Sequence, residues 1–462
     1  HEGTLMKQQM FEREIHVLRD TFRRLLRRHA HTNLIKLVEK THPADMAVLF
    51  RYFVDSEQDQ LFAMMRPHEH TGEFMTELDE SILQNLLADV SPDRIAELID
   101  PISASDQAEI VNHLPDEQAQ DVIHLLKKEE AEELEEILAY PEDSAGSLMY
   151  TDVFTLQEET SARDAIAALQ HEDAAEMVFY LYVTNDANQL TGIISLRDLV
   201  TTSPDSMLKD MMIRKVHTVY PDTDQEEVAQ IVSQYNYLAV PVIDHDENLL
   251  GIVTVDDVVD VIREEATEDF LKMAGVGKDR EILLKSSWEN AKSRFPWLFA
   301  SWIGGVAAAT IIGLYENLLE TTLILAAFIP VIIGMGGNIG TQTSTIIVRG
   351  LATGRVNVGN NMKILFKEIR VGLILGLLYG VLLGLFTFTR FMDLSPYLGI
   401  IVGLSISISM LIATTIGAFV PLFLNKLEID PAVATGPFVT TSIDIVGVTL
   451  YFLIASFFLP LG

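Results

Sequence analysis

The chain has 462 residues, of which 48% are hydrophobic, and its formal net charge is −33. Residues 286–462 hold nine of the 33 Lys and Arg and eight of the 66 Asp and Glu, so residues 1–285 carry 24 basic and 58 acidic side chains, a balance of −34. This acidity excludes nucleic acid as a partner and makes cations the expected ligands. The absence of Cys excludes disulfides and thiolate metal sites.

The first part of the chain, residues 5–140, is expected to form an all-α helical solenoid. Short amphipathic segments follow one another, and several begin at a proline, as at Pro43, Pro92 and Pro115. Each segment has one apolar stripe, which is typical of helices stacked in a superhelix. The acidic run at 127–136 keeps a helical period and is expected to be a solvated helix face.

Residues 141–262 carry an α/β pattern that occurs twice. The two halves end in GIISLRDLV (192–200) and GIVTVDDVV (251–259), which resemble tandem CBS domains, the Bateman module. The resemblance implies an adenine nucleotide site where a strand end meets a helix N-terminus, because hydroxyl, carboxylate and backbone N–H groups meet there. Helix capping by the same residues is the alternative. The candidate nucleotide contacts are Ser195, Arg197, Asp198, Tyr237, Thr254 and Asp257.

An acidic helix is expected to leave the second CBS half and to continue as a connecting helix over residues 263–290. Its carboxylates recur at i, i+3, i+7 and i+11 from Asp257, so they share one face. Like charges at this spacing repel, and hard divalent cations such as Mg²⁺ would relieve the repulsion. A solvated acidic face is the alternative. The candidate cytosolic metal ligands are Asp89, Asp93, Asp224, Glu226, Asp256, Asp257, Asp260, Glu265, Glu268 and Asp269.

Residues 291–462 are expected to form a transmembrane domain of five helices. The apolar segments cover about 296–315, 322–347, 369–389, 397–424 and 437–460, each near the roughly 20 residues that a bilayer requires. The loop at 349–370 is rich in Lys and Arg. The positive-inside rule therefore places this loop and the N-terminal domains in the cytoplasm of a multi-pass plasma or inner membrane protein.

The second apolar segment is interrupted by a proline, glycines and polar residues. Such a segment is tolerated in a bilayer only where it packs on other helices or lines a water-filled path. Residues 330–342 follow the pattern PxxxGxxGNxGxQ, which resembles the signature of the MgtE magnesium channel family. A packing helix and a phosphate-binding loop are the alternatives, but the strand and the Lys of a phosphate loop are missing. The candidate pore-lining residues are Pro330, Gly337, Asn338, Gly340, Gln342, Thr441 and Asp444.

Asp444 is a carboxylate inside the fifth predicted span, where burial in lipid is costly unless it meets water, a cation or a partner. Residues 440–447 resemble the TTxxDxxG segment of the MgtE family, in which the Asp faces the ion. A protonated Asp bonded across helices is the alternative. Residues 286–462 contain no His or Cys, so oxygen ligands favour Mg²⁺, Ca²⁺ or Mn²⁺.

The resemblance to the MgtE family extends over residues 20–462. It implies a homodimer with a central pore for Mg²⁺ uptake, closed when the acidic cytosolic domains bind Mg²⁺. ATP would be regulatory and not hydrolysed, so the chain is not expected to be an enzyme. One alternative is a CBS-regulated transporter of another divalent cation, Mn²⁺ or Co²⁺, gated mainly by adenine nucleotide. Another is a membrane-anchored nucleotide sensor.

Overall fold

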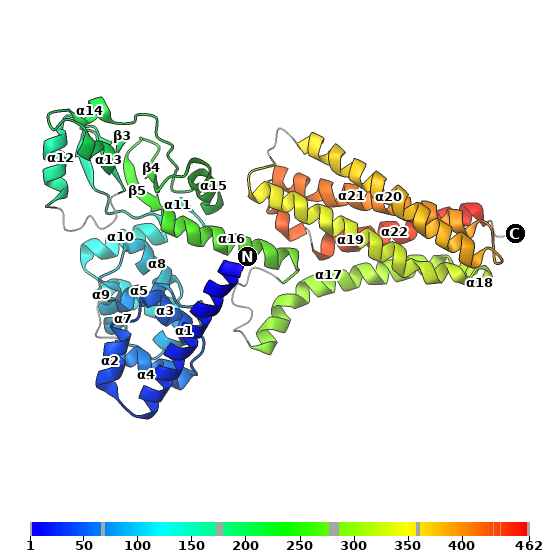
Figure 1. Ribbon diagram of the computed structural model, residues 1–462, viewed down its shortest axis with the longest axis horizontal. Helices are drawn as coiled ribbons and strands as arrows, with labels where there is room; N and C mark the ends of the chain where they lie inside the picture. Colours follow the sequence, from blue (N-terminus) through cyan, green and yellow to red (C-terminus); the bar gives the residue numbers. More distant parts are fainter. Residues whose placement is uncertain are drawn as a thin grey trace. The chain divides into compact units, whose positions relative to one another are not determined.

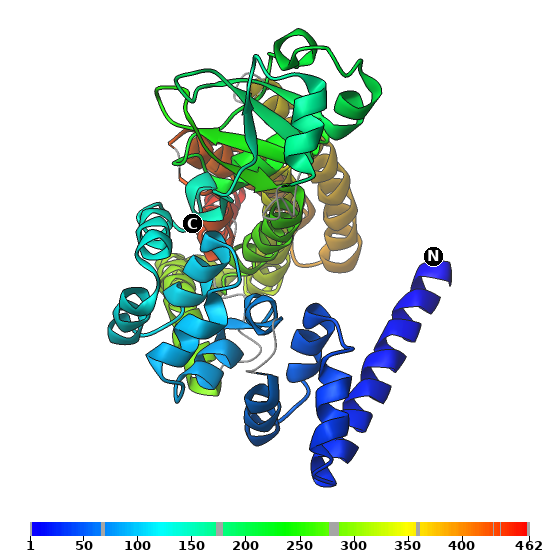
Figure 2. The ribbon, with the colours of Figure 1, turned by 90° about the vertical axis from the view of Figure 1, so that its left-hand side faces the viewer.

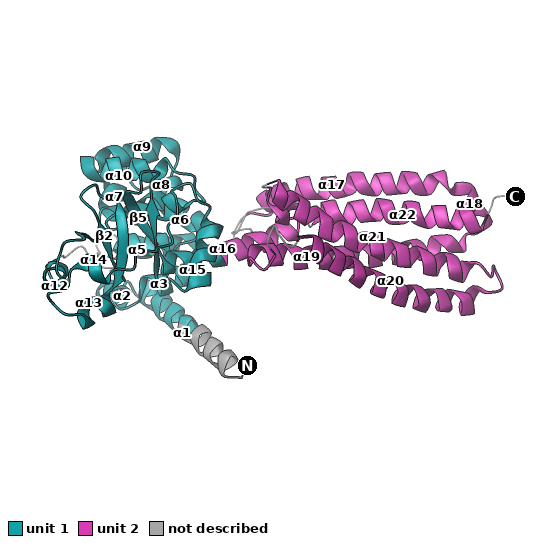
Figure 3. Ribbon diagram, turned by 90° about the horizontal axis from the view of Figure 1, so that it is seen from above, with its two compact units in different colours: residues 1–262 teal, residues 263–462 magenta. Residues whose placement is uncertain are grey.

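The computed structural model describes residues 2–65, 70–171, 179–276, 286–356, 361–427, 429–434 and 436–459, with side chains from Ile15 onward. Residues 277–285 of the expected connecting helix and residues 357–360 of the basic loop lie outside this described part. The chain divides into two compact units, residues 1–262 and residues 263–462, shown in Figure 3.

The first unit begins with one long helix, α1, and continues with short helices that follow one another closely (Figure 1). Pro43 and Pro92 begin two of them, at the positions that the sequence predicts. The helices are α1 (Glu2–Arg27), α2 (His31–Val38), α3 (Pro43–Phe50), α4 (Asp55–Met65), α5 (Thr71–Thr76), α6 (Glu80–Leu87), α7 (Pro92–Ile99), α8 (Ala104–Asn112), α9 (Asp116–Leu125) and α10 (Lys128–Leu138).

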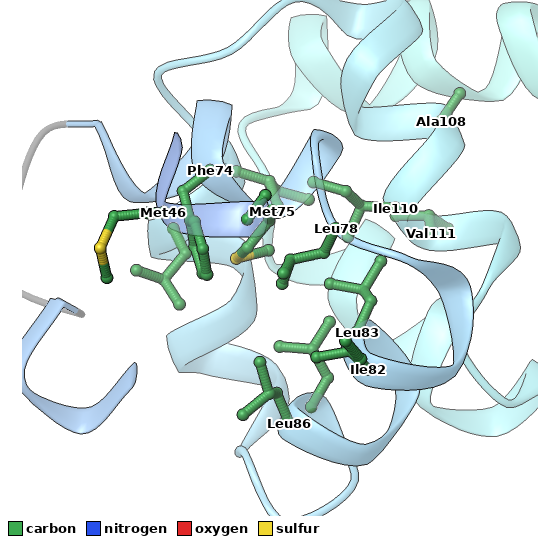
Figure 4. Packing of buried hydrophobic residues seen from close by; sticks show 14 of the residues in the cluster. Met46, Phe74, Met75, Leu78, Ile82, Leu83, Leu86, Ala108, Ile110 and Val111 are labelled. Atoms are coloured by element: carbon green, nitrogen blue, oxygen red, sulfur yellow. The ribbon is translucent and has the colours of Figure 1, made fainter. Parts of the chain in front are cut away.

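One apolar core runs through these helices. Phe74 and Met75 of α5 pack with Met46 of α3, Leu83 of α6 and Ile110 of α8, all of them buried (Figure 4). Because each short helix has one apolar face, it becomes stable only by packing on its neighbours. The expected helical N-terminal domain is therefore confirmed.

The repeated α/β pattern forms two small sheets, drawn in green in the upper part of Figure 2. In the first, β2 pairs with β1 in parallel and with β3 in antiparallel orientation; in the second, β4 and β5 are antiparallel. The strands are β1 (Thr155–Gln157), β2 (Tyr180–Thr184), β3 (Leu190–Ser195), β4 (Ala239–Ile243) and β5 (Leu249–Thr254). The helices are α11 (Ala145–Leu148), α12 (Ala162–Leu169), α13 (Leu196–Thr201), α14 (Leu208–Met211) and α15 (Gln225–Tyr235).

The two halves use the same hairpin turn. Asn188 and Glu247 adopt the left-handed conformation, with φ of 62° and 65°. In each turn a side chain at the start, Asn185 or Asp244, accepts backbone hydrogen bonds of 2.8–3.0 Å. The predicted internal repeat is therefore confirmed, and α16 (Val255–Met273) continues directly from β5.

The second unit contains five helices that are long and apolar enough to cross a membrane, within the described residues. They lie side by side in Figure 3; α19 packs on α21 and α22, α20 on α21, and α17 on α22. This arrangement confirms the expected five-span domain. The elements are α17 (Ser287–Leu314), α18 (Glu316–Thr321), α19 (Ile324–Ala352), α20 (Asn361–Phe391), α21 (Leu398–Lys426), the 3₁₀ turn η2 (Pro431–Ala434) and α22 (Pro437–Phe458).

Candidate functional site

One face of the membrane helix α19 carries a row of polar side chains. Asn338, Gln342 and Thr345 are exposed on the single chain, and their spacing of three and four residues aligns them along the helix. A Cβ atom at Gly337 would meet no other part of the described chain within 4 Å, so the space beside the row is open. Exposed amides are unfavourable in hydrocarbon. The row therefore requires a water-filled path or a second polypeptide. Pro330 lies earlier in α19 and is also exposed on the single chain.

Two other predicted pore residues, Gly340 and Thr441, lie at helix contacts. A Cβ atom at Gly340 would overlap the side chain of Ile443 on α22, and the backbone of Gly417 on α21 lies against the carbonyl group of Gly340. Thr441 packs onto Gly304 of α17 in the same way. Small residues at these points let the helices approach closely, as in other membrane bundles.

Asp444 is half-buried within α22. The preceding residue, Ile443, packs against Gly336 and Gly340 of α19, so Asp444 lies at the same level of the bundle as Asn338. In the described part of the chain Asp444 makes no hydrogen bond and no ion pair. Because an isolated carboxylate is costly at this depth, its partner must be water, a cation or a group from a second chain.

The start of α16 brings carboxylates from two domains together. Asp257 accepts hydrogen bonds from the hydroxyl group and, at 3.3 Å, the backbone N–H of Thr254. Burial raises the pKa of Asp257 to about 6. Repulsion by Asp256 and Asp106 also raises this pKa, whereas the hydrogen bonds from Thr254 lower it. Burial also raises the pKa of Asp106 on α8, and Glu73 and Asp256 contribute. A proton or a cation would therefore stabilise the buried carboxylates of Asp106 and Asp257.

The other predicted ligands of the first unit are more dispersed. Asp89, Asp93 and Asp260 are exposed. Asp224 caps α15 by accepting a hydrogen bond of 2.8 Å from the backbone N–H of Glu226. Within the described residues, no three His, Asp or Glu side chains are arranged to hold one metal ion. The assignment of metal ligands therefore stays a prediction.

The last turns of α16 are held by a buried ion pair in the second unit. The Nζ atom of Lys272 lies 2.5 Å from Oδ2 of Asp430 and also contacts Glu268, one helical turn earlier. The side chains of Lys272 and Glu268 are each 9% exposed. Burial alone would lower the pKa of Lys272, but the hydrogen bonds to both carboxylates outweigh it and raise the pKa. Burial, followed by repulsion from Asp430, raises the pKa of Asp269 to about 6, although Lys272 and Arg349 oppose this rise.

The backbone beyond Lys272 contacts the start of α22. A Cβ atom at Gly436 would lie 3.1 Å from the carbonyl oxygen of Met273, and one at Gly275, where φ is 70°, would lie 3.1 Å from the Pro437 ring. The hydroxyl group of Ser293 on α17 donates a hydrogen bond of 2.8 Å to the carbonyl oxygen of Val276. Residues 273–276, at and just beyond the end of α16, therefore contact both the N-terminal part of α17 and the first turn of α22.

In the first CBS half, the predicted nucleotide contacts lie at an accessible strand end. The Ser195 hydroxyl group donates to Oδ2 of Asp198 at 2.7 Å and accepts from the backbone N–H of Asp198 at 3.1 Å. This is a helix cap, but Arg197 and Asp198 remain exposed. The strand partner of Ser195 is Tyr180, whose hydroxyl oxygen accepts a hydrogen bond of 3.5 Å from the backbone N–H of Leu238. The structure therefore brings Ser195 close to the segment that contains Tyr237.

An aromatic group extends this surface. Tyr237 stacks on Tyr235 with ring centroids 5.4 Å apart, and Tyr235 stacks on His217 at 4.3 Å. Aromatic faces can stack on a nucleobase, and the hydroxyl, carboxylate and guanidinium groups nearby suit ribose and phosphate.

The corresponding site in the second CBS half is closed. Thr254 is 1% exposed, and its hydroxyl group is bonded to Asp257. Because the Asp257 carboxylate is also buried, within electrostatic range of Asp106 on α8, it is not available to a ribose in this arrangement. The two predicted nucleotide motifs therefore differ in access although their sequences match.

Sequence reasoning did not select several residues of these sites: Glu73, Asp106, Tyr180, Lys272 and Asp430. Lys272 follows Glu268 by four residues, a spacing that predicts a helical ion pair. Asp430 precedes a proline turn, which is a local signal. Asp106 occupies a first helical turn, like many acidic residues that only stabilise a helix N-terminus.

Comparison with protein-family models agrees with these features. Residues 329–454 match the MgtE model, described as a divalent cation transporter. Residues 41–143 match the MgtE intracellular N domain, and residues 145–205 and 208–264 match the CBS domain. The fold and these matches thus define a multi-pass membrane protein of the divalent cation transporter class, with a helical N domain and a pair of CBS domains.

Individual relatives narrow this class. The magnesium transporter MgtE of Enterococcus faecalis is 37% identical over 420 residues, which cover 90% of this chain and 92% of the relative. The magnesium transporter MgtE of Bacillus subtilis is 36% identical over 70% of this chain and 71% of its own length. A crystal structure of the cytosolic domain of the Mg²⁺ channel MgtE in complex with ATP covers 53% of this chain and 99% of that domain, with a TM-score of 0.50 and 29% identity. The chain therefore belongs to the MgtE family.

Proposed function

We propose that this protein is a Mg²⁺ channel of the plasma or inner membrane that works as a homodimer, with residues 5–140 and 141–262 in the cytoplasm. The observation that carries the proposal is Asp444, a carboxylate within a span that has no hydrogen-bond or ion-pair partner in the described chain. It lies at the level of the exposed polar row of α19. Two copies that faced each other through this row would enclose a polar path with two carboxylates.

The proposed path suits a hydrated hard cation. Carboxylate, amide and hydroxyl oxygens are available from Asp444, Asn338, Gln342 and Thr345, and Mg²⁺ prefers oxygen ligands while it retains several waters. A doubly charged ion gains about 4.6 kcal/mol per 100 mV of inside-negative potential, so uptake needs no ATP hydrolysis.

Flux into liposomes that contain the full chain tests the transported ion. We expect Mg²⁺ entry driven by an inside-negative potential, with weaker entry of Mn²⁺ or Co²⁺ in competition. Preferred entry of Mn²⁺ or Co²⁺ would instead support the alternative of a CBS-regulated transporter for another divalent cation. Absence of any ion flux from folded protein would support a membrane-anchored sensor.

We further propose that Mg²⁺ on the cytosolic side closes the pore through the acidic residues of α16 and the domains around it. Burial raises the pKa values of Asp106 and Asp257, and repulsion from Asp256 adds to both, so a counter-charge near these carboxylates would be stabilising. Mg²⁺ that binds the compact arrangement preferentially would shift the equilibrium by RT ln(1 + [Mg²⁺]/Kd) for each site.

Inside-out patch recordings test this regulation. Neutralising Asp257, Glu265, Glu268 and Asp269 together, or deleting residues 1–135, should raise the cytosolic Mg²⁺ concentration at which half the current is lost. Closure of these variants at the wild-type concentration would remove the acidic residues from the gating mechanism.

Adenine nucleotide is the second proposed regulatory ligand, bound without hydrolysis at the first CBS half. Two observations support this site. Its candidate contacts lie at an accessible strand end: Ser195, Arg197, Asp198 and Tyr237. Tyr180 is the strand partner of Ser195 and is also hydrogen-bonded to Leu238, the residue after Tyr237. The related cytosolic domain is known in complex with ATP.

A further inference from the structure

We infer that Lys272 is a permanent counter-ion that holds the end of α16 on the turn before α22, so that the position of α16 is transmitted to the helix that carries Asp444. Lys272 is thus a positioning residue. The consequence for conduction rests on the proposed function above, whereas the docking of α16 does not.

The first support is that the two carboxylate oxygens of Asp430 have different partners. Its Oδ2 atom lies 2.5 Å from Nζ of Lys272, and its Oδ1 atom accepts a hydrogen bond of 2.7 Å from the backbone N–H of Ala432. Ala432 belongs to η2, and α22 begins shortly after it at Pro437. One side chain therefore joins the end of α16 to the turn that sets the start of α22.

The second support is the charge balance at this position. Lys272 contacts Glu268 and Asp430, and Asp269 lies within electrostatic range of Asp430 and Arg349. Without the ammonium group, the buried Glu268 and the half-buried Asp269 and Asp430 would lose this counter-charge. Removal of one partner from a buried ion pair is strongly unfavourable, because the other charge is left uncompensated. The positive charge here is a side chain of α16 itself, so the ion pair between Lys272 and Asp430 does not depend on a bound divalent ion.

The third support is the close backbone contact beyond the ion pair. Gly436 faces the carbonyl oxygen of Met273, and Gly275 faces Pro437; a Cβ atom at either glycine would lie 3.1 Å from its neighbour, which is closer than an ordinary van der Waals contact. Such contacts mean that the end of α16 and the start of α22 are closely packed. If Lys272 is released from Asp430, we therefore expect these backbone contacts to be lost together with the ion pair.

Amide hydrogen exchange of the full chain in lipid nanodiscs without divalent cations tests the docking directly. In Lys272→Met, which keeps the length of the side chain and removes its charge, we expect residues 263–276 to exchange at least tenfold faster than in wild type, with α19 and α21 unchanged. The matched control is Lys426→Met, because Lys426 is exposed at the end of α21 and has no ion pair in the described part of the chain. Wild-type exchange of residues 263–276 in Lys272→Met would overturn the inference.

The transmission to the pore is tested by a double-mutant cycle in inside-out patches. Lys272→Met and Asp430→Asn should each raise the half-closing cytosolic Mg²⁺ concentration about tenfold, and the double variant should shift it no further than either single variant. Independent, additive shifts would overturn the coupling between these residues. If wild type itself carries no Mg²⁺ current, the proposed function fails, but the exchange experiment still decides whether Lys272 docks α16.

Discussion

Gly417 on α21 and Gly340 on α19 meet backbone to backbone: a Cβ atom at Gly417 would lie 2.5 Å from the carbonyl oxygen of Gly340. Because a backbone group cannot rotate away as a side chain can, even one added methyl group must separate the helices. We predict that Gly417→Ala destabilises the membrane domain by about 1–3 kcal/mol, the usual effect of overpacking. A lower thermal unfolding midpoint of the full chain in detergent would show it.

The control for this prediction is Gly313→Ala. A Cβ atom at Gly313 would meet nothing in the described chain within 4 Å, and Ala favours a helix over Gly by up to about 1 kcal/mol. Its midpoint should be equal to or above that of wild type. Equal midpoints for Gly417→Ala and Gly313→Ala would mean that the contact between α19 and α21 yields without cost.

Asp444 gives the second prediction. Asp444→Asn keeps the size of the side chain and removes its charge, so Mg²⁺ flux into liposomes should fall at least tenfold while the chain stays folded. The reason is that a fixed negative charge in the span replaces part of the attraction between the ion and water. Initial rates at equal protein density measure the effect.

The matched control is Asp393→Asn, since Asp393 is an exposed carboxylate between α20 and α21. Its flux should match that of wild type. Wild-type flux through folded Asp444→Asn would exclude the carboxylate from the ion path and would favour a role in helix packing.

Much of the fold could be predicted from local sequence. Pro43 and Pro92 begin helices where the sequence places them, because proline suits a first helical turn. The repeated strand pattern and the five apolar segments are equally local signals. Helix ends were less predictable: α20 begins at Asn361 and α17 at Ser287, ahead of the apolar segments, because polar helical turns extend beyond the span.

The sites depend on tertiary packing to a greater degree. Ser195 and Thr254 occupy equivalent places in matching motifs, yet only Thr254 is fully buried. The Asp257 carboxylate that Thr254 contacts is also buried, within electrostatic range of Asp106 on α8. Gly340 belongs to the family pattern as clearly as Asn338, but it faces α21 and α22 while Asn338 is exposed. Which residues of a motif are exposed and which face a neighbouring helix was not encoded in their spacing alone.

The third prediction concerns the nucleotide. ATP should bind the full chain in calorimetry, and Asp198→Ala should weaken binding at least tenfold, because the exposed carboxylate is the group placed to accept ribose hydroxyl hydrogen bonds. Arg197→Ala should weaken ATP more than adenosine, since the guanidinium group suits phosphate.

Thr254→Val is the matched control, because it alters the closed second half at the equivalent position. Its ATP affinity should equal that of wild type. If Thr254→Val and Asp198→Ala weaken ATP binding equally, the nucleotide enters the second half after an opening of the contact with α8; if neither variant changes it, the site lies elsewhere.

The last prediction follows from the acidic contact at the start of α16. Burial raises the pKa of Asp257 to about 6 in the folded chain, above the value of about 3.9 for an unfolded Asp. Between these two pH values the folded chain therefore binds more protons than the unfolded chain does. The contribution of protonated Asp257 to the free energy of unfolding is fully present below about pH 4 and is lost as the pH rises through about 6. Without divalent cations, the unfolding midpoint of wild type should rise as the pH falls from 7.5 to 5. Asp257→Asn should have a higher midpoint at pH 7.5 and a weaker rise, the remainder reflecting groups such as Asp269. Asp246→Asn, a change of an exposed carboxylate, should follow wild type; if Asp257→Asn follows it as well, Asp257 is not under strain from its acidic neighbours.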